Sequence, residues 1–595
     1  MANYRAPLED IEFVVKNLID FDTLAQLPAY AEYEMDGDFA VSVLEEAGKF
    51  ASGVLAPNRE AGDRVGSVMV DGQVKLAPGY GEAFKQMGEA GWYAISMPTD
   101  VGGQGLPELL NTSANEMWTA ADIAFSLGPL LSAGAALAIY AHGSEEQKQT
   151  YLPKMLSGEW SGTMNLTEPQ SGSDLATIKT KAIPQGDHYL ISGQKIYISY
   201  GDHDATSNII HLVLARIEGA PEGTGGISLF IVPKFILDAD GNAGERNDVK
   251  CVSIEHKLGI HGSPTCVMQY GDNGGAVGYL VGKENRGLQA MFTMMNEARL
   301  KVGIEGLGVS EAAYQHALYY AKDRVQGRDS AGQKAAIIKH ADVRRMLMTM
   351  KSLTEAMRAY SYNEAVNFDI AHHHPNRELG AAMQRRVDLM IPVIKGWMTE
   401  IGQEVASLGV QIHGGMGYVE ETGAAQFYRD IRIAAIYEGT NGIQAADLVG
   451  RKLGMDGGQT MMSVIAEMED TLAAMQAHAK ASAFAGYLAS AINGLKDSTA
   501  AVLAMMQSNP QQAMLASFNY MMQAGYCFGG YHMARAMMVA HDALAADATN
   551  KQMQAKVHST RFYMEHMLPR AEMCGQSVRN SNNDDLLSMD DELFG

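Results

Sequence analysis

One carboxylate stands apart in the segment IYEGTNGIQ, residues 436–444. Glu438 lies between a tyrosine and a glycine, and no other charged residue occurs from Ile433 to Gln444. A glutamate that is held dry has a raised pKa, which makes it a stronger general base for removing a proton from carbon. The alternative is a carboxylate at the start of a helix, where the helix dipole favours a negative charge. The segment alone leaves both interpretations open.

A second candidate is the loop MNLTEPQSGSDLATIKTKA, residues 164–182, which concentrates hydroxyl groups around Pro169. Thr167, Ser171 and Ser173 could simply stabilise a polar turn. They could also, together with free backbone amides, bind a ligand that carries many hydrogen-bond acceptors.

Two glycine-rich segments, GGQG at 102–105 and HGGMG at 413–417, could approach a phosphate closely. Neither follows a strand and opens a helix in a βαβ unit, so a Rossmann site is disfavoured. HEXXH, GXSXG and Walker patterns are absent, which excludes the common metallohydrolase, α/β-hydrolase and P-loop classes. The four cysteines have no metal-like spacing, so no metal site is predicted and reduced, buried thiols are expected.

The elements that must position these residues follow the order helical, β, helical, which predicts an α+β fold. Residues 1–163 read as a helical domain, and GSEEQK carries a capping box at Ser144 and Gln147. Residues 164–285 contain short β-branched and aromatic strands, typical of a small antiparallel barrel or sandwich. Helical periodicity returns in 286–450, a predicted helical bundle, and 451–595 is an extra helical domain with a loose acidic tail.

Composition limits the function classes. The chain has 595 residues, 47% of them hydrophobic, and a net charge of −23, which disfavours nucleic acid as a partner. No secretory signal is visible, so a cytoplasmic location is expected. Two stretches without Asp, Glu, Lys or Arg, Ile123–Ser144 and Ser498–Ala534, are interrupted by glycine, proline or polar residues. They indicate a buried helix and a pair of buried helices rather than membrane spans.

Taken in order, the segments resemble the acyl-CoA dehydrogenase family. TEPQSGSD resembles its TEPxxGSD motif, QKIYIS (194–199) its QKxWIT, and QIHGGMGY (411–418) its QxxGGxGY. RVQGR (324–328) resembles its arginine motif after the first long bundle helix, and IYEGTNGIQ the segment with its catalytic glutamate. The motifs cover about residues 90 to 450, and five in the family's order are specific.

The resemblance implies an N-terminal helical domain, a central β domain and a four-helix bundle with FAD bound between the last two. It implies Glu438 as the base that removes the α-proton of an acyl thioester, whose oxygen is polarised by the Glu438 amide and a ribityl hydroxyl. It places Gly439 and Arg299 at the substrate, and Ser173 at both substrate and flavin. The remaining FAD contacts that it implies are Leu166, Thr167, Tyr197, Ser199, Arg324, Gln411, Gly414, Gly415, Thr440 and Asn441.

The sequence departs from the family at three positions. The tryptophan beside the flavin is Tyr197, the phenylalanine of the arginine motif is Gly327, and an acidic residue near the start of the bundle helix is Asn296. Some relatives carry the base on that helix, where Glu297 lies one residue out of register because Ala298 aligns instead. Glu438 is therefore the favoured base.

The start YRAPLEDIEF and the C-terminal extension resemble the branch that oxidises 3-methylmercaptopropionyl-CoA to methylthioacryloyl-CoA, with electrons passing to electron-transfer flavoprotein. A homodimer is expected, since the extension would cover the surface through which tetrameric relatives pair dimers. Three alternatives remain: a short- or medium-chain fatty acyl-CoA dehydrogenase, a DNA-associated alkylation-response flavoprotein, and a catalytically inactive relative. Residues 451–595 hold ten Lys and Arg against fourteen Asp and Glu, which disfavours binding to DNA.

Overall fold

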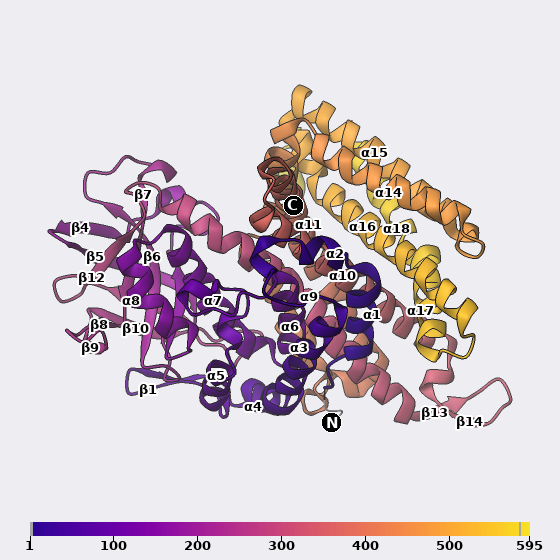
Figure 1. Ribbon diagram of the computed structural model, residues 1–595, viewed down its shortest axis with the longest axis horizontal. Helices are drawn as coiled ribbons and strands as arrows, with labels where there is room; N and C mark the ends of the chain where they lie inside the picture. The colour runs from indigo at the N-terminus through magenta and orange to yellow at the C-terminus, as the bar shows by residue number, and fades with distance from the viewer. Residues whose placement is uncertain (1–3, 582–584) are drawn as a thin grey trace. The chain divides into compact units, whose positions relative to one another are not determined.

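The computed structural model describes residues 4–581 and 585–595 and contains two compact units (Figure 1). One unit, here called the β unit, comprises Lys49–Asn111 and Ala121–Lys301. The other, the helical unit, comprises the chain up to Gly48, Thr112–Ala120 and Val302 onward. The fold is α+β, as predicted, with the extra helices at the C-terminal end. The boundaries of the four predicted domains stay a prediction, because these units group the chain differently.

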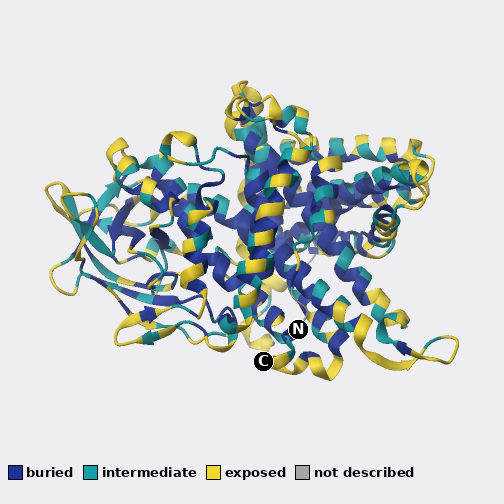
Figure 2. Cartoon of the chain, turned by 60° about the horizontal axis from the view of Figure 1, so that its bottom comes forward, coloured by how far each residue is buried: buried dark blue, intermediate teal, exposed yellow. Residues whose placement is uncertain are grey.

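A single eight-stranded sheet organises the β unit. Strands β5, β12, β7, β6 and β4 pair in a closed ring, while β11 and β10 extend it beside β5 and β3 pairs with β6. All pairs are antiparallel except β3–β6 and β4–β6. Exposed residues lie mainly in the loops that join strands (Figure 2). The sheet strands are β3 (Trp160–Asn165), β4 (Lys181–Gln185), β5 (His188–Ser199), β6 (Asn208–Ile217), β7 (Ile227–Pro233), β10 (Val249–Ile254), β11 (Thr265–Tyr270) and β12 (Ala276–Val281).

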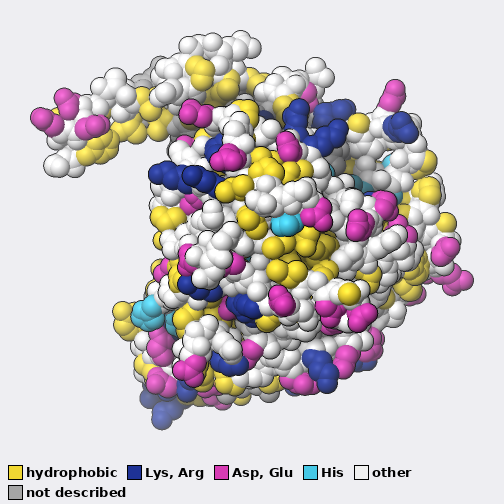
Figure 3. Space-filling model, turned by 90° about the vertical axis from the view of Figure 1, so that its left-hand side faces the viewer, with side chains coloured by type: hydrophobic (Ala, Val, Ile, Leu, Met, Phe, Trp, Pro, Cys, Tyr) yellow, Lys and Arg dark blue, Asp and Glu magenta, His cyan; other side chains and the backbone are white. Residues whose placement is uncertain are grey.

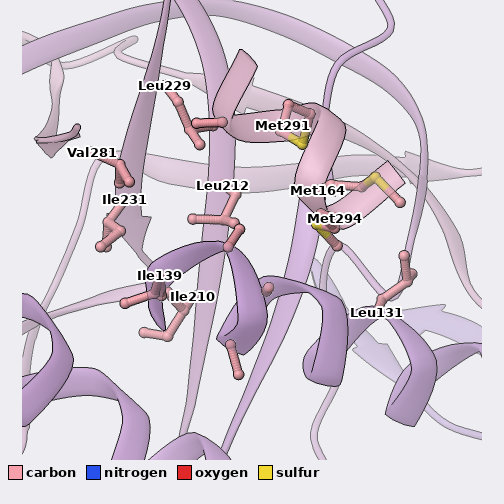
Figure 4. Packing of buried hydrophobic residues seen from close by; sticks show 14 of the residues in the cluster. Leu131, Ile139, Met164, Ile210, Leu212, Leu229, Ile231, Val281, Met291 and Met294 are labelled. Carbon is pink, nitrogen blue, oxygen red and sulfur yellow. The ribbon is translucent and has the colours of Figure 1, made fainter. Parts of the chain in front are cut away.

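Helix α7 (Ile123–His142) and the first turns of α9 (Gly287–Asp323) cover one face of this sheet. Leu212 from β6 and Ile231 from β7 point toward Ile139 of α7 and Met291 of α9 (Figure 4). Among the described residues α7 is the one helix long and apolar enough to cross a membrane, but 78% of its most apolar window is buried. This burial confirms the predicted core helix.

The other helices of the β unit are α4 (Arg59–Arg64), α5 (Tyr80–Glu89) and α8 (Glu145–Leu156), and α6 (Glu108–Ala121) runs through a boundary between the units. The predicted capping box starts α8: Gln147 N donates to Ser144 Oγ at 3.1 Å, and Ser144 N donates to Gln147 Oε1 at 3.0 Å. Two hairpins complete the unit, β1 (Val68–Val70) with β2 (Gln73–Lys75) and β8 (Phe235–Leu237) with β9 (Ala243–Arg246).

The helical unit is built on three long helices, the second part of α9, α10 and α11, with a hairpin of β13 (Val325–Arg328) and β14 (Lys334–Ala336) after α9. Its helices besides α9 are α1 (Leu8–Leu18), α2 (Phe21–Ala25), α3 (Gly37–Phe50), α10 (Ala341–His373), α11 (Arg377–His413), α12 (Ala424–Ile431), α13 (Asn441–Asp447), α14 (Gln459–Ala477), α15 (Ala485–Ser508), α16 (Pro510–Ala546), α17 (Lys551–Phe562) and α18 (Pro569–Asn580).

The C-terminal extension packs against the long helices of the same unit. The uncharged stretch 498–534 forms the predicted pair of helices, α15 and α16, joined at Asn509. Helix α16 lies against α10 and α11, and it approaches α11 closely at Gly525, where an added Cβ would lie 2.1 Å from Cγ of Trp397. Only glycine allows the two helices to approach so closely.

The last residues form two exposed 3₁₀ turns, Leu586–Ser588 and Asp591–Phe594, and part of the predicted acidic tail, 582–584, lies outside the described residues. All four cysteines, Cys251, Cys266, Cys527 and Cys574, are buried and free, as predicted.

Candidate active site

In the β unit, the polar loop after β3 is joined to the last part of β5. Ile196 N donates to the carbonyl oxygen of Thr167 at 2.9 Å. On its other side β5 carries a β-bulge against β11, since Ile198 pairs with Cys266 but Lys195 pairs with Met268. Within the bulge Tyr197 has a φ of +59°, and its side chain is 61% exposed. A bulge re-aims a side chain, so an aromatic ring stands out at the surface beside the loop.

A buried ion pair holds this loop. Lys195 Nζ donates to Glu168 Oε1 at 2.8 Å and to the carbonyl oxygen of Leu166 at 2.9 Å. Glu168 also accepts from Thr180 Oγ1 at 2.6 Å and from the amide of Lys179 at 2.7 Å. Burial raises the pKa of Glu168, but the Lys195 charge and these donors outweigh it and bring the pKa to about 2. Burial lowers the pKa of Lys195 to about 8.

Breaking this pair is expected to destabilise the β unit. Glu168→Gln leaves the Lys195 ammonium buried without its counter-charge, so the free energy of unfolding should fall by about 3–5 kcal/mol at pH 7. Because the folded pKa of Glu168 lies below its unfolded value of 4.5, this stabilisation is present above that pH and disappears as pH falls toward 2. Urea denaturation measures the change, with Asp187→Asn, on an exposed turn of the same sheet, as a control expected to stay within about 0.5 kcal/mol. Equal effects of the two substitutions would contradict the prediction.

The structure therefore groups Leu166, Thr167, Tyr197 and Ser199 at one end of the sheet. The carbonyl of Ser199 accepts from Thr163 Oγ1 at 2.8 Å, which joins β5 to β3. Ser173 lies exposed in the loop, next to a tight turn in which Ser171 N donates to the carbonyl of Glu168 at 2.9 Å. Glu168 and Lys195 were not singled out from the sequence, although Glu168 lies inside TEPQSGSD and Lys195 inside QKIYIS.

In the helical unit, the ends of α9 and α11 lie together. His413, at the end of α11, stacks on Tyr320 of α9 with ring centroids 4.3 Å apart, and Tyr320 lies one turn before the exposed Arg324. Gly414 and Gly415 follow His413, and a Cβ added at either would meet no atom within 4 Å. The backbone of Gly414 and Gly415 is therefore exposed, and the exposed Gln411 lies one helical turn before it on α11.

These surfaces fit the cofactor that the resemblance implies. The glycine backbone and Arg324 suit the phosphates of FAD, since amides can approach an anion closely where no side chain intervenes. The exposed Tyr197 ring and the hydroxyls near Thr167 suit the flat, acceptor-rich flavin. Each unit by itself presents groups of the required chemistry.

Glu438 lies in a short irregular segment before α13 rather than in the first turn of that helix. Its backbone has a φ of +55°, in the left-handed region that disfavours any side chain with a Cβ, and Gly439 follows with a φ of +86°. Two successive residues in this region turn the chain sharply. Such strain persists only where surrounding contacts hold it, and it is common at active sites.

Two side chains hold this turn through its carbonyl groups. Lys395 Nζ, from α11, donates to the carbonyl of Gly439 at 2.8 Å and to Asn441 Oδ1 at 2.8 Å. Gln444 Nε2 donates to the carbonyls of Glu438 at 3.1 Å and Gly439 at 3.2 Å. Neither residue was singled out from the sequence. The signal was available for Lys395, the one charged residue between Asp388 and Glu400.

Thr440 and Asn441 begin α13. Thr440 Oγ1 accepts from the amide of Ile443 at 3.3 Å as the N-cap. The Asn441 amide is buried against α11 and donates to Glu400 Oε1 at 2.8 Å and Thr399 Oγ1 at 2.9 Å. Both side chains therefore position the turn, and their predicted contacts with FAD stay predictions.

Within the helical unit, the Glu438 turn and the 411–415 segment are not adjacent. Lys395, which bonds the turn, and Gln411 are sixteen residues apart on α11, about 24 Å at 1.5 Å per residue. One FAD phosphate cannot contact both places on one helical unit. The resemblance implies the same separation, because it places part of the phosphate site across a subunit interface.

The alternative base, Glu297, lies in the β unit on the first part of α9. Burial raises its pKa to about 7, the nearby Glu108 adds to that effect, and Lys301 opposes it. The buried Arg299 follows on the same helix. The pKa of Glu297 therefore suits proton transfer, and this carboxylate is the alternative to Glu438 as the base.

Comparison with known proteins identifies the family. The descriptions "Acyl-CoA dehydrogenase, N-terminal domain", "middle domain" and "C-terminal domain" match residues 37–159, 163–272 and 285–453, and "Acetyl-CoA dehydrogenase C-terminal like" matches 464–590. The chain belongs to the acyl-CoA dehydrogenase family. It is therefore an oxidoreductase acting on the CH–CH group of acyl-CoA, and FAD is its cofactor, as the resemblance implied.

Individual relatives extend this similarity over nearly the whole chain. It is 45% identical to 3-methylmercaptopropionyl-CoA dehydrogenase of Ruegeria pomeroyi over 95% of this chain and 96% of that protein. It is 35% identical to butyryl-CoA dehydrogenase of Syntrophomonas wolfei over 95% of both chains. The structure of a Bacillus anthracis acyl-CoA dehydrogenase complexed with FAD shares its fold at 23% identity and a TM-score of 0.72, covering 97% of this chain and 93% of that one.

Proposed function

We propose that this acyl-CoA dehydrogenase oxidises 3-methylmercaptopropionyl-CoA to methylthioacryloyl-CoA and passes the electrons to electron-transfer flavoprotein. The observation that carries the proposal is the 45% identity, over 95% of the chain, to a relative named for that substrate. The match covers 96% of that relative as well, so the two chains are similar over nearly their full lengths.

In this proposal Glu438 removes the α-proton of the thioester. Its carboxylate extends from a turn that Lys395 and Gln444 hold by its carbonyls, so the base is positioned before the substrate arrives. The amide of Glu438 would polarise the thioester oxygen as the α-carbon becomes negative. Bound FAD would supply the acceptor for the hydride that leaves the β-carbon. Gly439 and Arg299 would contact the acyl-CoA.

A fatty acyl substrate is the second candidate, because the chain is also 35% identical to a butyryl-CoA dehydrogenase. The two substrates differ in the chain beyond the β-carbon, where a thioether replaces a methyl group. An acyl pocket can distinguish the two substrates only through its contacts with the atoms beyond the β-carbon. One methylene group in an apolar pocket changes the binding free energy by about 1–3 kcal/mol.

Turnover of a series of acyl-CoAs with a ferrocenium-type acceptor tests the substrate. We expect kcat/KM for 3-methylmercaptopropionyl-CoA to exceed that for butyryl-CoA and octanoyl-CoA by about tenfold or more, which is about 1.4 kcal/mol of transition-state binding. The heat-treated enzyme provides the blank. A tenfold advantage for butyryl-CoA would assign a fatty acyl substrate, and repeating the best reaction with electron-transfer flavoprotein tests the acceptor.

We also propose a cytoplasmic homodimer. The extension that packs on α10 and α11 is the feature expected to prevent further pairing of dimers, and light scattering would detect a tetramer. Binding to DNA is not proposed: besides the net charge of −23, acidic side chains are spread among the basic ones on the face that Figure 3 shows.

A further inference from the structure

A second glutamate of the helical unit contacts the turn that carries Glu438. Glu305, on α9, is fully buried, and its Oε2 accepts a hydrogen bond from the hydroxyl of Tyr437, the residue immediately before Glu438. Its other oxygen, Oε1, is buried and has no hydrogen-bond partner among the described residues. It is the one charged residue between Lys301 and Glu311, in an otherwise apolar and glycine-rich segment.

This environment favours the protonated form of Glu305. An ionised carboxylate with one oxygen buried and unpaired loses hydration that nothing replaces. Glu438 and Tyr437 face Glu305 from the turn, and Lys395 faces it from α11. Burial raises the pKa of Glu305 to about 8 and the Glu438 charge adds to this effect, while the Tyr437 hydrogen bond and Lys395 oppose it.

We propose that Glu305 is a positioning residue for this reaction: its buried, protonated carboxyl anchors Tyr437 and thereby holds the Glu438 turn without placing a second negative charge beside the base. The proposal rests on the proposed role of Glu438. The anchor acts on a strained backbone, since Glu438 has a φ of +55°. Releasing Tyr437 would let the turn relax and move the carboxylate away from the α-carbon.

The anchor is tested by a double-substitution cycle of Glu305→Leu and Tyr437→Phe. Each single change should lower kcat at least tenfold with a smaller effect on KM, and the double change should cost little more than either alone, because both remove one interaction. Glu305→Gln keeps an acceptor for Tyr437 and should recover most of the loss seen with leucine. Additive effects of the two changes, or no recovery by glutamine, would overturn the proposal.

The protonated state is tested by pH. Since the folded pKa of Glu305 lies above its usual 4.5, its neutral form stabilises the fold at low pH, and that contribution is lost as pH rises through about 8. The thermal midpoint of the wild type should therefore fall more between pH 6 and 9 than that of Glu305→Gln, by a difference of about 2 °C. Ser310→Ala, a buried change on the same helix, should show the wild-type slope.

Activity should follow the same ionisation. The wild type should lose kcat above about pH 8, where the second charge opposes the negative charge developing on the substrate, and Glu305→Gln should lack this decline. If stability and rate depend on pH in the same way in the wild type and in Glu305→Gln, the proposed role of Glu305 is wrong and the proposed function is unaffected. Substrate-driven flavin bleaching that survives in Glu438→Gln would instead refute the proposed function, so the two failures are distinguishable.

Discussion

Glu438→Gln is expected to slow reduction of the bound flavin by substrate by about 10³-fold or more. Glutamine keeps the shape of the side chain but has no basic oxygen, and a positioned general base typically contributes 10²- to 10⁴-fold. The flavin content should be unchanged, because the side chain acts on the substrate. Stopped-flow bleaching of the flavin absorbance with a saturating acyl-CoA measures the effect.

Glu297→Gln is the matched control, because it makes the same chemical change at the alternative base. Some relatives carry the catalytic glutamate close to this position on the first bundle helix. The burial-raised pKa of Glu297, about 7, makes this comparison informative. If bleaching persists in Glu438→Gln and disappears in Glu297→Gln, the base lies on α9 and the role assigned to the turn before α13 is wrong.

Gly415→Asp is expected to remove FAD from the purified protein. A Cβ at this position meets no protein atom within 4 Å and the backbone φ is not in the left-handed region, so the chain itself should accept aspartate. The new carboxylate would instead repel a phosphate and keep the backbone amides from approaching it. The ratio of flavin absorbance to protein absorbance after gel filtration gives the occupancy.

Gly415→Asn separates charge from size, because asparagine has the shape of aspartate without the charge. We expect intermediate flavin content for asparagine and close to none for aspartate, with unchanged far-ultraviolet circular dichroism in both. Full occupancy in Gly415→Asp would exclude the 411–415 segment from the phosphate site.

The order of elements could be predicted from the sequence because each type has its own period. The β-branched strands between 164 and 285, the capping box at Ser144 and the two helices around Asn509 were all confirmed. These features depend on residues close together in the chain. The architecture of the sheet could be predicted only as a barrel or a sandwich. The order of the strands depends on which strands pair, and periodicity does not identify the pairs.

The site was predicted where a motif marks it and missed where tertiary contacts form it. Glu438 was found as an isolated charge, yet its φ of +55° was not foreseen, because the contacts that hold the turn include Lys395 from the distant helix α11. Lys395 and Glu305 are also isolated charges in apolar segments. An isolated charge in an apolar segment therefore marks buried polar contacts in the long helices as well as in the loops.

The contact between Gly525 and Trp397 limits which C-terminal extensions can be combined with which bundles. An indole on α11 occupies the space that a side chain on α16 would need, so Gly525 cannot gain a side chain while Trp397 keeps its indole. The extension is therefore not an interchangeable module: a chimera that takes residues 451–595 from a relative with alanine at the position of Gly525 would need a smaller residue than Trp397 in the recipient.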